Sequence, residues 1–159
     1  MMAPMNTPIH IAFNVEVPEL TAELPRLEEL VREICKKYQV KAATIDIGIV
    51  DDDGIIKVHQ EFLGKNNTTD VISFDLSDVL EQSRTFQLVV NAEMAARQAA
   101  KRGHSAEAEL ALYITHGMLH NLGFDDLDEE DAKNMHKTED AVLQELGFGI
   151  IYYHNENTE

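Results

Sequence analysis

The segment from residue 106 to residue 122 constrains the fold more than any other, because it has the composition of a helix that is apolar nearly all round. Its apolar residues are Leu110, Leu112, Tyr113, Ile114, Met118, Leu119 and Leu122. A helix with so little polar surface usually lies buried in a protein core. Other elements must cover this segment on several sides, and a chain of 159 residues is long enough to supply them within one domain.

Four strands are predicted in the first two thirds of the chain. Residues 9–15 and 45–49 alternate apolar side chains with polar or small ones, which is typical of half-buried strands. VISF at 71–74 and FQLVV at 86–90 are rich in β-branched and aromatic residues, which favour strands. The segment between these last two contains Asp and Ser and could hold a wide hairpin.

Helices are predicted between and after these strands. The first begins near Thr21 to Pro25 and its apolar spacing continues to Tyr38. Asn91 and Ser105 are good N-caps, and Gly103 is a good helix stop. With the buried segment, the predicted helices therefore include 92–102, 106–122 and about 128–146, the last ending at Gly147.

A shorter helix follows Asp51 to Asp53 and stops at Gly64. Its inward face is predicted to carry Ile55, Ile56, Val58 and Phe62, with His59 on the exposed side. The single cysteine, Cys35, lies on the apolar side of the first helix and is predicted to be a core residue, so no disulfide-linked partner is expected.

Strands first and helices last indicate an α+β fold. We predict one domain over residues 1–159, with a small, mainly four-stranded mixed sheet packed against several helices and a buried central helix. Residues 1–8 and 152–159 lack periodicity and are predicted to be frayed tails.

The net charge of −16 opposes non-specific attraction to phosphate backbones and argues against a simple RNA-binding protein. A nucleic-acid substrate would need a local cationic patch or a bound metal. No basic segment with an apolar run opens the chain, and no stretch approaches the roughly 20 apolar residues of a membrane span. We therefore expect a cytoplasmic protein without a membrane partner.

The buried helix ends in HGMLHNLGFDD, residues 116–126. His116 and His120 are four residues apart, so both imidazoles project from one helix face. Gly123 can end the helix in the left-handed conformation and turn Asp125 or Asp126 toward the same point. The alternative is a pair of core histidines satisfied by protein carboxylates. We favour a metal site formed by His116, His120 and Asp126, with Asp125 as the other candidate for the third ligand.

Two imidazoles, one carboxylate and a water suit tetrahedral zinc, so one Zn²⁺ per chain is expected, although another divalent metal would also accept these ligands. An open fourth position makes the site a catalytic candidate. Zinc peptidases with an HExxH motif carry a glutamate base after the first histidine, where this chain has Gly117. Peptidase chemistry is therefore disfavoured.

Three segments of the chain, TDVISF at 69–74, RQAAKRGHS at 97–105 and the 116–126 stretch, resemble the YbeY family of bacterial metal-dependent endoribonucleases. The resemblance runs from the first strand to the last helix. It implies an α+β metalloprotein that binds ribosomal RNA and the ribosome or its proteins, matures the 3′ end of the small-subunit RNA and serves ribosome quality control.

The resemblance also assigns residues, with two departures. The family pattern HGxLHLxGYDH places the first two zinc ligands at His116 and His120, and its third histidine falls at Asp126. A carboxylate is an acceptable zinc ligand, although it reduces the net charge of the site. The family arginine of YRGK falls at Leu63 within FLGK, and leucine cannot hold a phosphate bidentately.

Other cationic residues could contact phosphate. Lys65 follows Leu63 by two positions, and Arg97 and Lys101 form a second cluster with Arg102. The alternative, which is more common for surface charges, is that Arg97, Lys101 and Arg102 form a solvated helix face.

The remaining polar residues have mostly structural interpretations. Thr69 and Asp70 could line the cleft, but a Thr-Asp pair at the start of a strand is more often a turn that satisfies its own backbone. His104 is expected to stabilise the turn between two helices, and His136 with Glu139 could supply a partner for a metal-bound imidazole.

Three functional hypotheses follow. The first is a zinc-dependent, single-strand-specific endoribonuclease acting on ribosomal RNA. The second is a ribosome-associated binding protein in which the metal is structural and catalysis is weakened, as Leu63 and Asp126 together suggest. The third is a zinc hydrolase of another substrate, disfavoured by Gly117.

Overall fold

A computed structural model describes residues 8–20, 22–78, 80, 82–124 and 127–148. Its four strands are β1 (Ile9–Val15), β2 (Ala43–Val50), β3 (Val71–Asp75) and β4 (Arg84–Asn91). They form one sheet in the order β1-β2-β4-β3, with β1, β2 and β4 parallel and β3 antiparallel to β4. The predicted mixed four-stranded sheet and the hairpin between its last two strands are confirmed.

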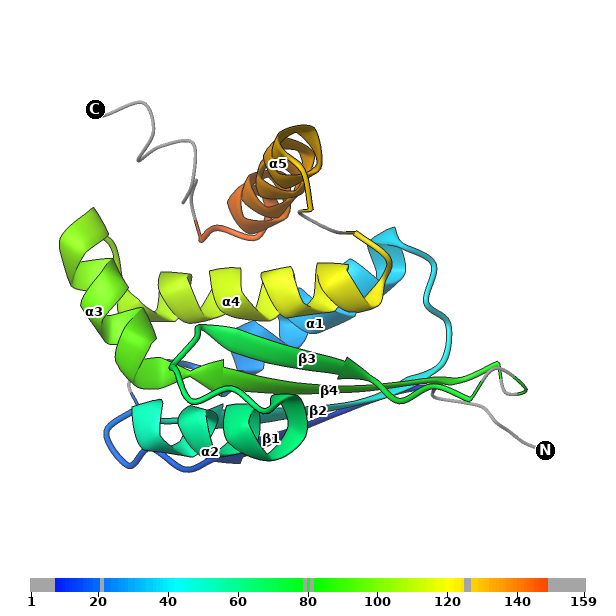
Figure 1. The fold of residues 1–159 in the computed structure, drawn as a ribbon. Helices are drawn as coiled ribbons and strands as arrows, with labels where there is room; N and C mark the ends of the chain where they lie inside the picture. The colour runs from blue at the N-terminus through cyan, green and yellow to red at the C-terminus, as the bar shows by residue number, and fades with distance from the viewer. Residues whose placement is uncertain (1–7, 21, 79, 81, 125–126, 149–159) are drawn as a thin grey trace.

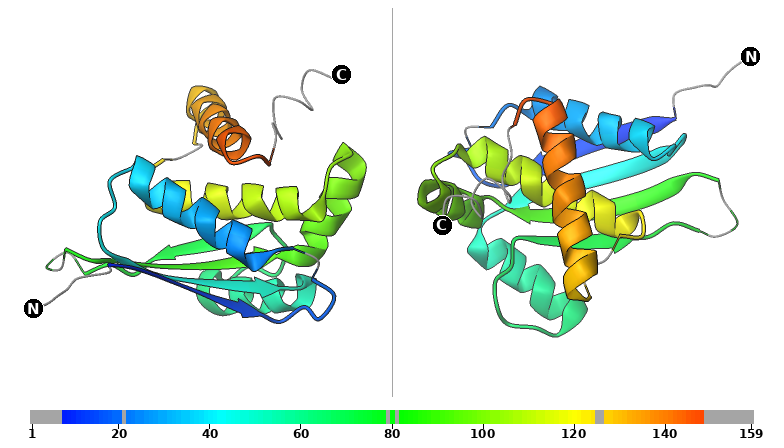
Figure 2. Two further views of the ribbon diagram at one scale, coloured as in Figure 1. Left: turned by 180° about the vertical axis from the view of Figure 1, so that it is seen from behind. Right: turned by 90° about the horizontal axis from the view of Figure 1, so that it is seen from above.

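The helices are α1 (Leu24–Lys37), α2 (Asp52–Leu63), α3 (Ala92–Arg102), α4 (Ala106–Asn121) and α5 (Glu129–Glu145). Helices α1 and α4 cover one face of the sheet and α2 covers the other, while α3 stands at the end of the sheet where α4 begins (Figure 1). Helix α5 lies across α4 on the side away from the sheet (Figure 2). The α+β prediction is confirmed.

Side-chain caps begin four of these helices. Asp51, Asn91 and Ser105 accept hydrogen bonds from backbone N–H groups in the first turns of α2, α3 and α4, as predicted. Asp128 caps α5 in the same way. Because these caps are local, they fix the helix starts independently of tertiary packing.

Most of the hydrophobic core lies between the sheet and α1, α3 and α4. Ile45 and Ile47 of β2 and Phe86 and Leu88 of β4 point into it and are fully or almost fully buried. Cys35 is buried there too, as predicted, and burial raises the pKa of its thiol to about 11. A smaller cluster on the other face packs α2 against the sheet through Val50, Ile55, Ile72 and Val89.

The face that α2 buries differs from the prediction at two positions. His59 is buried, with its Nδ1 atom 2.7 Å from the carbonyl oxygen of Asn67, whereas it was expected on the exposed side. Phe62 was expected to face inward, but 62% of its surface is exposed. The loop after α2 folds back and covers His59, while the side chains of the last turn of the helix, including Leu63, are exposed.

The predicted frayed tails fall largely outside the described residues. The exception is Pro8, whose carbonyl oxygen accepts a hydrogen bond from the N–H of Ala43 at 2.8 Å. Among the described residues, no helix is both long and apolar enough to cross a bilayer.

Helix α4 is buried on nearly every side, as its composition predicts. Each residue from Ala108 to Met118 is buried except His116. Gly117 faces the sheet so closely that a Cβ atom there would lie 2.9 Å from Leu88 Cδ2 and 3.1 Å from Val71 Cγ2. Only glycine allows α4 to approach β3 and β4 to this distance.

We therefore expect Gly117→Ala to destabilise the protein although alanine favours helices. Overpacking costs about 1–3 kcal/mol, and the gain in helix propensity is only about 1 kcal/mol. Chemical denaturation would measure the difference. Adding Leu88→Val should recover part of the loss by making room, and a Gly117→Ala variant at least as stable as wild type would contradict the close approach.

Candidate metal centre

His116 and His120 lie one turn apart on α4, on the face that α5 approaches. Their Nε2 atoms are 3.1 Å apart. Their ring centroids are separated by 4.6 Å, with the planes inclined at 79°. The predicted convergence of the two imidazoles is therefore present, with one nitrogen of each ring directed at the other.

Glu139 of α5 holds the far side of the His116 ring. Its carboxylate is completely buried, with Oε2 2.6 Å from His116 Nδ1 and Oε1 3.1 Å from His136 Nδ1. Burial alone would raise the pKa of Glu139, but the hydrogen bonds with His116 and His136 outweigh it and the pKa is lowered. An ionised carboxylate can only accept hydrogen bonds, so His116 Nδ1 donates to Glu139, and His116 Nε2 is the ring nitrogen directed at His120.

This arrangement fits a divalent ion. Two nitrogens bound to a tetrahedral zinc at about 2.0–2.1 Å would lie about 3.3 Å apart, close to the separation here. Metal-bound histidines commonly donate their other N–H to a carboxylate, which is the place that Glu139 occupies. The donor set of two imidazoles backed by a buried anion therefore suits zinc or a similar metal.

The third predicted ligand cannot be compared with this geometry, because Asp125 and Asp126 lie outside the described residues. Gly123 has a φ of 105° and ends α4 with the turn that the sequence predicts. Within the described ranges, no set of three or more His, Cys, Asp or Glu side chains is placed to hold a metal. The metal site of His116, His120 and Asp126 therefore stays a prediction, because the position of its third ligand is not described.

Gly117 bears on the chemistry as well as on packing. The position that carries the glutamate base in HExxH peptidases points at Leu88 and Val71 rather than into the space beside the histidines. No side chain could act as a general base from this position without displacing the sheet.

The cationic residues proposed for phosphate contact lie in two places. Lys65 is exposed in the loop that follows α2, and the C-terminal ends of α2 and α4 lie toward the same end of the molecule (Figure 1). Arg97 and Lys101 belong to α3, beside the opposite end of α4. The structure therefore does not gather these three residues around His116 and His120.

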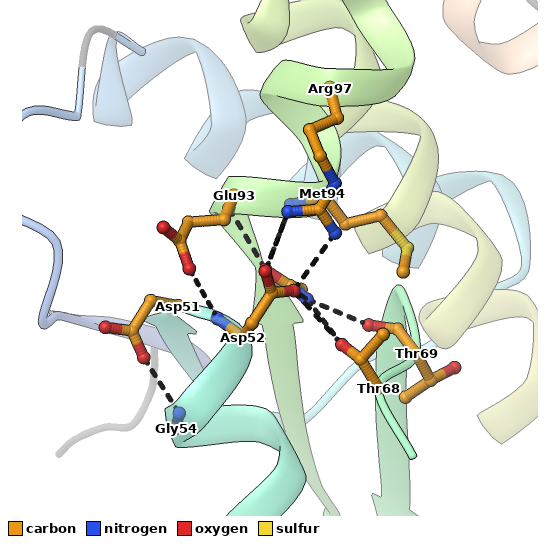
Figure 3. Close-up of polar contacts among 9 residues, drawn as sticks. Asp51, Asp52, Gly54, Thr68, Thr69, Glu93, Met94 and Arg97 are labelled. Atoms are coloured by element: carbon orange, nitrogen blue, oxygen red, sulfur yellow. Dashed lines mark hydrogen bonds and ion pairs between the residues drawn. The ribbon is translucent and has the colours of Figure 1, made fainter.

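Arg97 is engaged by Asp52 at the start of α2 (Figure 3). Its Nη1 and Nη2 atoms donate to the two carboxylate oxygens of Asp52 at 2.7 and 3.1 Å. The buried amide of Asn91 donates to Asp52 at 2.7 Å and also contacts Thr68 and Thr69, so the ion pair belongs to a network that ties α2, α3 and the loop before β3 together. Arg97, which was predicted to contact phosphate, therefore forms a structural ion pair with Asp52.

Two further polar predictions are confirmed. Asp70 accepts hydrogen bonds from the N–H of Val71 and the hydroxyl of Thr69, as expected for a turn that satisfies itself. His104 stabilises the turn between α3 and α4 through Glu109, whose Oε1 atom is 2.6 Å from its Nε2. The complete burial of Glu109 had no signal in the sequence.

A family model described as Endoribonuclease YbeY matches residues 13–147 of this chain. The chain belongs to the endoribonuclease YbeY family. Endoribonuclease YbeY of Carboxydothermus hydrogenoformans is 36% identical over 107 residues, which cover 67% of this chain and 75% of that protein. Endoribonuclease YbeY of Lysinibacillus sphaericus is 32% identical over 151 residues, which cover 87% and 96%.

The fold agrees with a solved structure. The solution structure of TM1509 from Thermotoga maritima is similar, with a TM-score of 0.57, 27% identity and coverage of 86% of this chain and 90% of that one. The resemblance to the YbeY family inferred from the three sequence segments is thus confirmed, and the matched region contains every helix of the site.

We expect Asp52→Asn to remove a pH-dependent contribution to stability. Hydrogen bonds from Arg97 and Asn91 lower the pKa of Asp52 from 3.8 to about 2. The folded-state pKa is below the unfolded one, so the contribution is present above about pH 4 and is lost as the pH falls toward 2. It should amount to about 1–2 kcal/mol after allowance for solvent screening at the half-exposed Arg97.

Denaturation of both proteins across this pH range tests the assignment. The stability difference between wild type and Asp52→Asn should shrink as the pH falls, and Arg97→Gln should show a smaller version of the same effect. A difference that does not change with pH would contradict it.

We expect Glu139→Gln to weaken zinc binding by about 10- to 100-fold, because a neutral amide supports the His116 imidazole less well than a carboxylate. Competition with a chromophoric chelator would measure the affinity directly. Glu145→Gln, at the exposed end of α5, is the matched control and should bind like wild type. If Glu139→Gln and wild type bound zinc with equal affinity, this would contradict an orienting role for Glu139.

Proposed function

We propose that the protein is a zinc-dependent, single-strand-specific endoribonuclease that processes ribosomal RNA. Membership of the endoribonuclease YbeY family supports the reaction class. The observation that carries the metal dependence is the 3.1 Å approach of the two Nε2 atoms with a buried carboxylate behind His116. We further propose that it acts in the cytoplasm with the ribosome or ribosomal proteins, at the 3′ end of the small-subunit RNA and in ribosome quality control.

His116, His120 and Asp126 would hold the ion. A divalent ion held by these residues would supply Lewis acidity, which favours ionisation of a water near neutral pH and polarises a phosphoryl oxygen. Glu139 accepts a hydrogen bond from His116 Nδ1 and so orients the ring with Nε2 directed into the site. His136 donates to the other oxygen of the same carboxylate and limits its rotation.

The charged and apolar residues near the histidines determine how strongly an anionic RNA strand would bind. Lys65 supplies a point charge at the histidine end of the molecule, whereas Leu63 cannot hold a phosphate bidentately. With a net charge of −16, long-range attraction is absent and binding must rely on local contacts.

One observation favours a second candidate, a ribosome-associated binding protein with weakened catalysis. Leu63 is half exposed at the end of α2 and Arg97 is paired with Asp52, so the guanidinium contacts expected for a strong phosphate clamp are missing from these two positions.

Cleavage of a short single-stranded RNA with added zinc separates the two candidates. Wild type should cleave it, and His116→Ala should lose more than about a hundredfold in rate because a ligand is lost. His10→Ala, an exposed histidine on β1, is the matched control and should keep wild-type activity. Inactive wild type that still co-sediments with ribosomes would favour the binding protein, and cleavage by His116→Ala would refute the metal site.

A further inference from the structure

Phe62 is an aromatic side chain that the fold leaves in solvent. It lies in the last turn of α2 with 62% of its surface exposed. Its ring meets Phe74 of β3 edge-to-face, with centroids 5.7 Å apart and planes inclined at 68°. The neighbouring Leu63 is also exposed, at 50%. Phe74 is half buried against the α2 side of the sheet, so it supports the Phe62 ring from one side only.

The aromatic pair lies close to the histidine end of α4. The carbonyl oxygen of Phe74 accepts a hydrogen bond of 3.4 Å from the side-chain amide of Asn121, the residue after His120. The C-terminal ends of α2, β3 and α4 therefore lie at the same end of the molecule, as Figure 1 shows. Helix α2 lies on the opposite face of the sheet from α4, but β3 is an edge strand, so a strand bound at the histidines would reach this surface around the β3 edge.

An exposed aromatic ring can bind a single strand without positive charge. Every base has a π-face, and bases of single-stranded RNA stack on aromatic side chains with little dependence on sequence. This contribution suits a chain with a net charge of −16 that has an uncharged leucine beside the ring. A paired strand keeps its bases stacked on one another and cannot use the ring in this way.

We propose that Phe62, supported edge-on by Phe74, is a stacking platform for a nucleobase of the single strand that the histidine site receives. This rests on the proposed function for its substrate class. It assigns Phe62 a role in binding and in preference for single strands, not in the cleavage step.

The test compares variants that keep or remove the aromatic face. Binding is measured in a His116→Ala background, which keeps the strand intact, with a short oligoadenylate and an abasic strand of equal length. Phe62→Leu should weaken oligoadenylate binding about tenfold, and Phe62→Tyr should stay within about twofold of Phe62. The abasic strand should bind all three proteins with the same low affinity.

Leu80→Ala is the matched control, since Leu80 is 90% exposed in the loop between β3 and β4 and should not contribute. Equal affinity of Phe62 and Phe62→Leu proteins for oligoadenylate would overturn the proposal, as would an equal loss on the abasic strand. Retained RNA affinity with lost ribosome co-sedimentation would assign the surface to a protein partner instead. Because binding is measured without cleavage, a failure here is distinct from absent nuclease activity in wild type.

Discussion

The burial of α4 on nearly every side is the constraint from which the rest of the structure follows. The sheet approaches it on one side so closely that Gly117 has no room for a side chain. Helices α1 and α3 pack along it, and α5 crosses it opposite the sheet. The two histidines lie on the face toward α5, where Glu139 meets His116. The same packing that stabilises the core thus fixes the orientation of the imidazoles before any ligand binds.

Charge explains why binding must be local in this protein. A chain with a net charge of −16 repels a polyanion at long range. Arg97 is held by Asp52 and Arg102 by Glu109, so these guanidinium groups stabilise the junctions of α3 rather than an open cationic surface. A metal between the histidines and an aromatic surface at Phe62 would provide attraction that does not depend on the overall charge.

The sequence predicted those features that depend on neighbouring residues. The strands, the capped starts of α2, α3 and α4 and the turn at Gly123 all arise from local patterns, and the structure has them near the expected bounds. The prediction of which face of α2 is buried was wrong at His59 and Phe62, because a short helix has too few apolar residues to define an apolar stripe. The loop that returns over His59 determines which side is buried. Helical spacing likewise placed His116 and His120 together, whereas the Asp52–Arg97 pair joins residues 45 positions apart and has no local pattern.

The central claim is that two imidazoles on a buried helix, one of them oriented by Glu139, bind a divalent metal. An anomalous-difference map collected at the zinc absorption edge, from crystals grown with saturating zinc, tests this directly. The account predicts a single strong peak about 2.0–2.1 Å from the Nε2 atoms of both His116 and His120. A map without a peak there, with the two imidazoles bonded only to protein atoms, would contradict it.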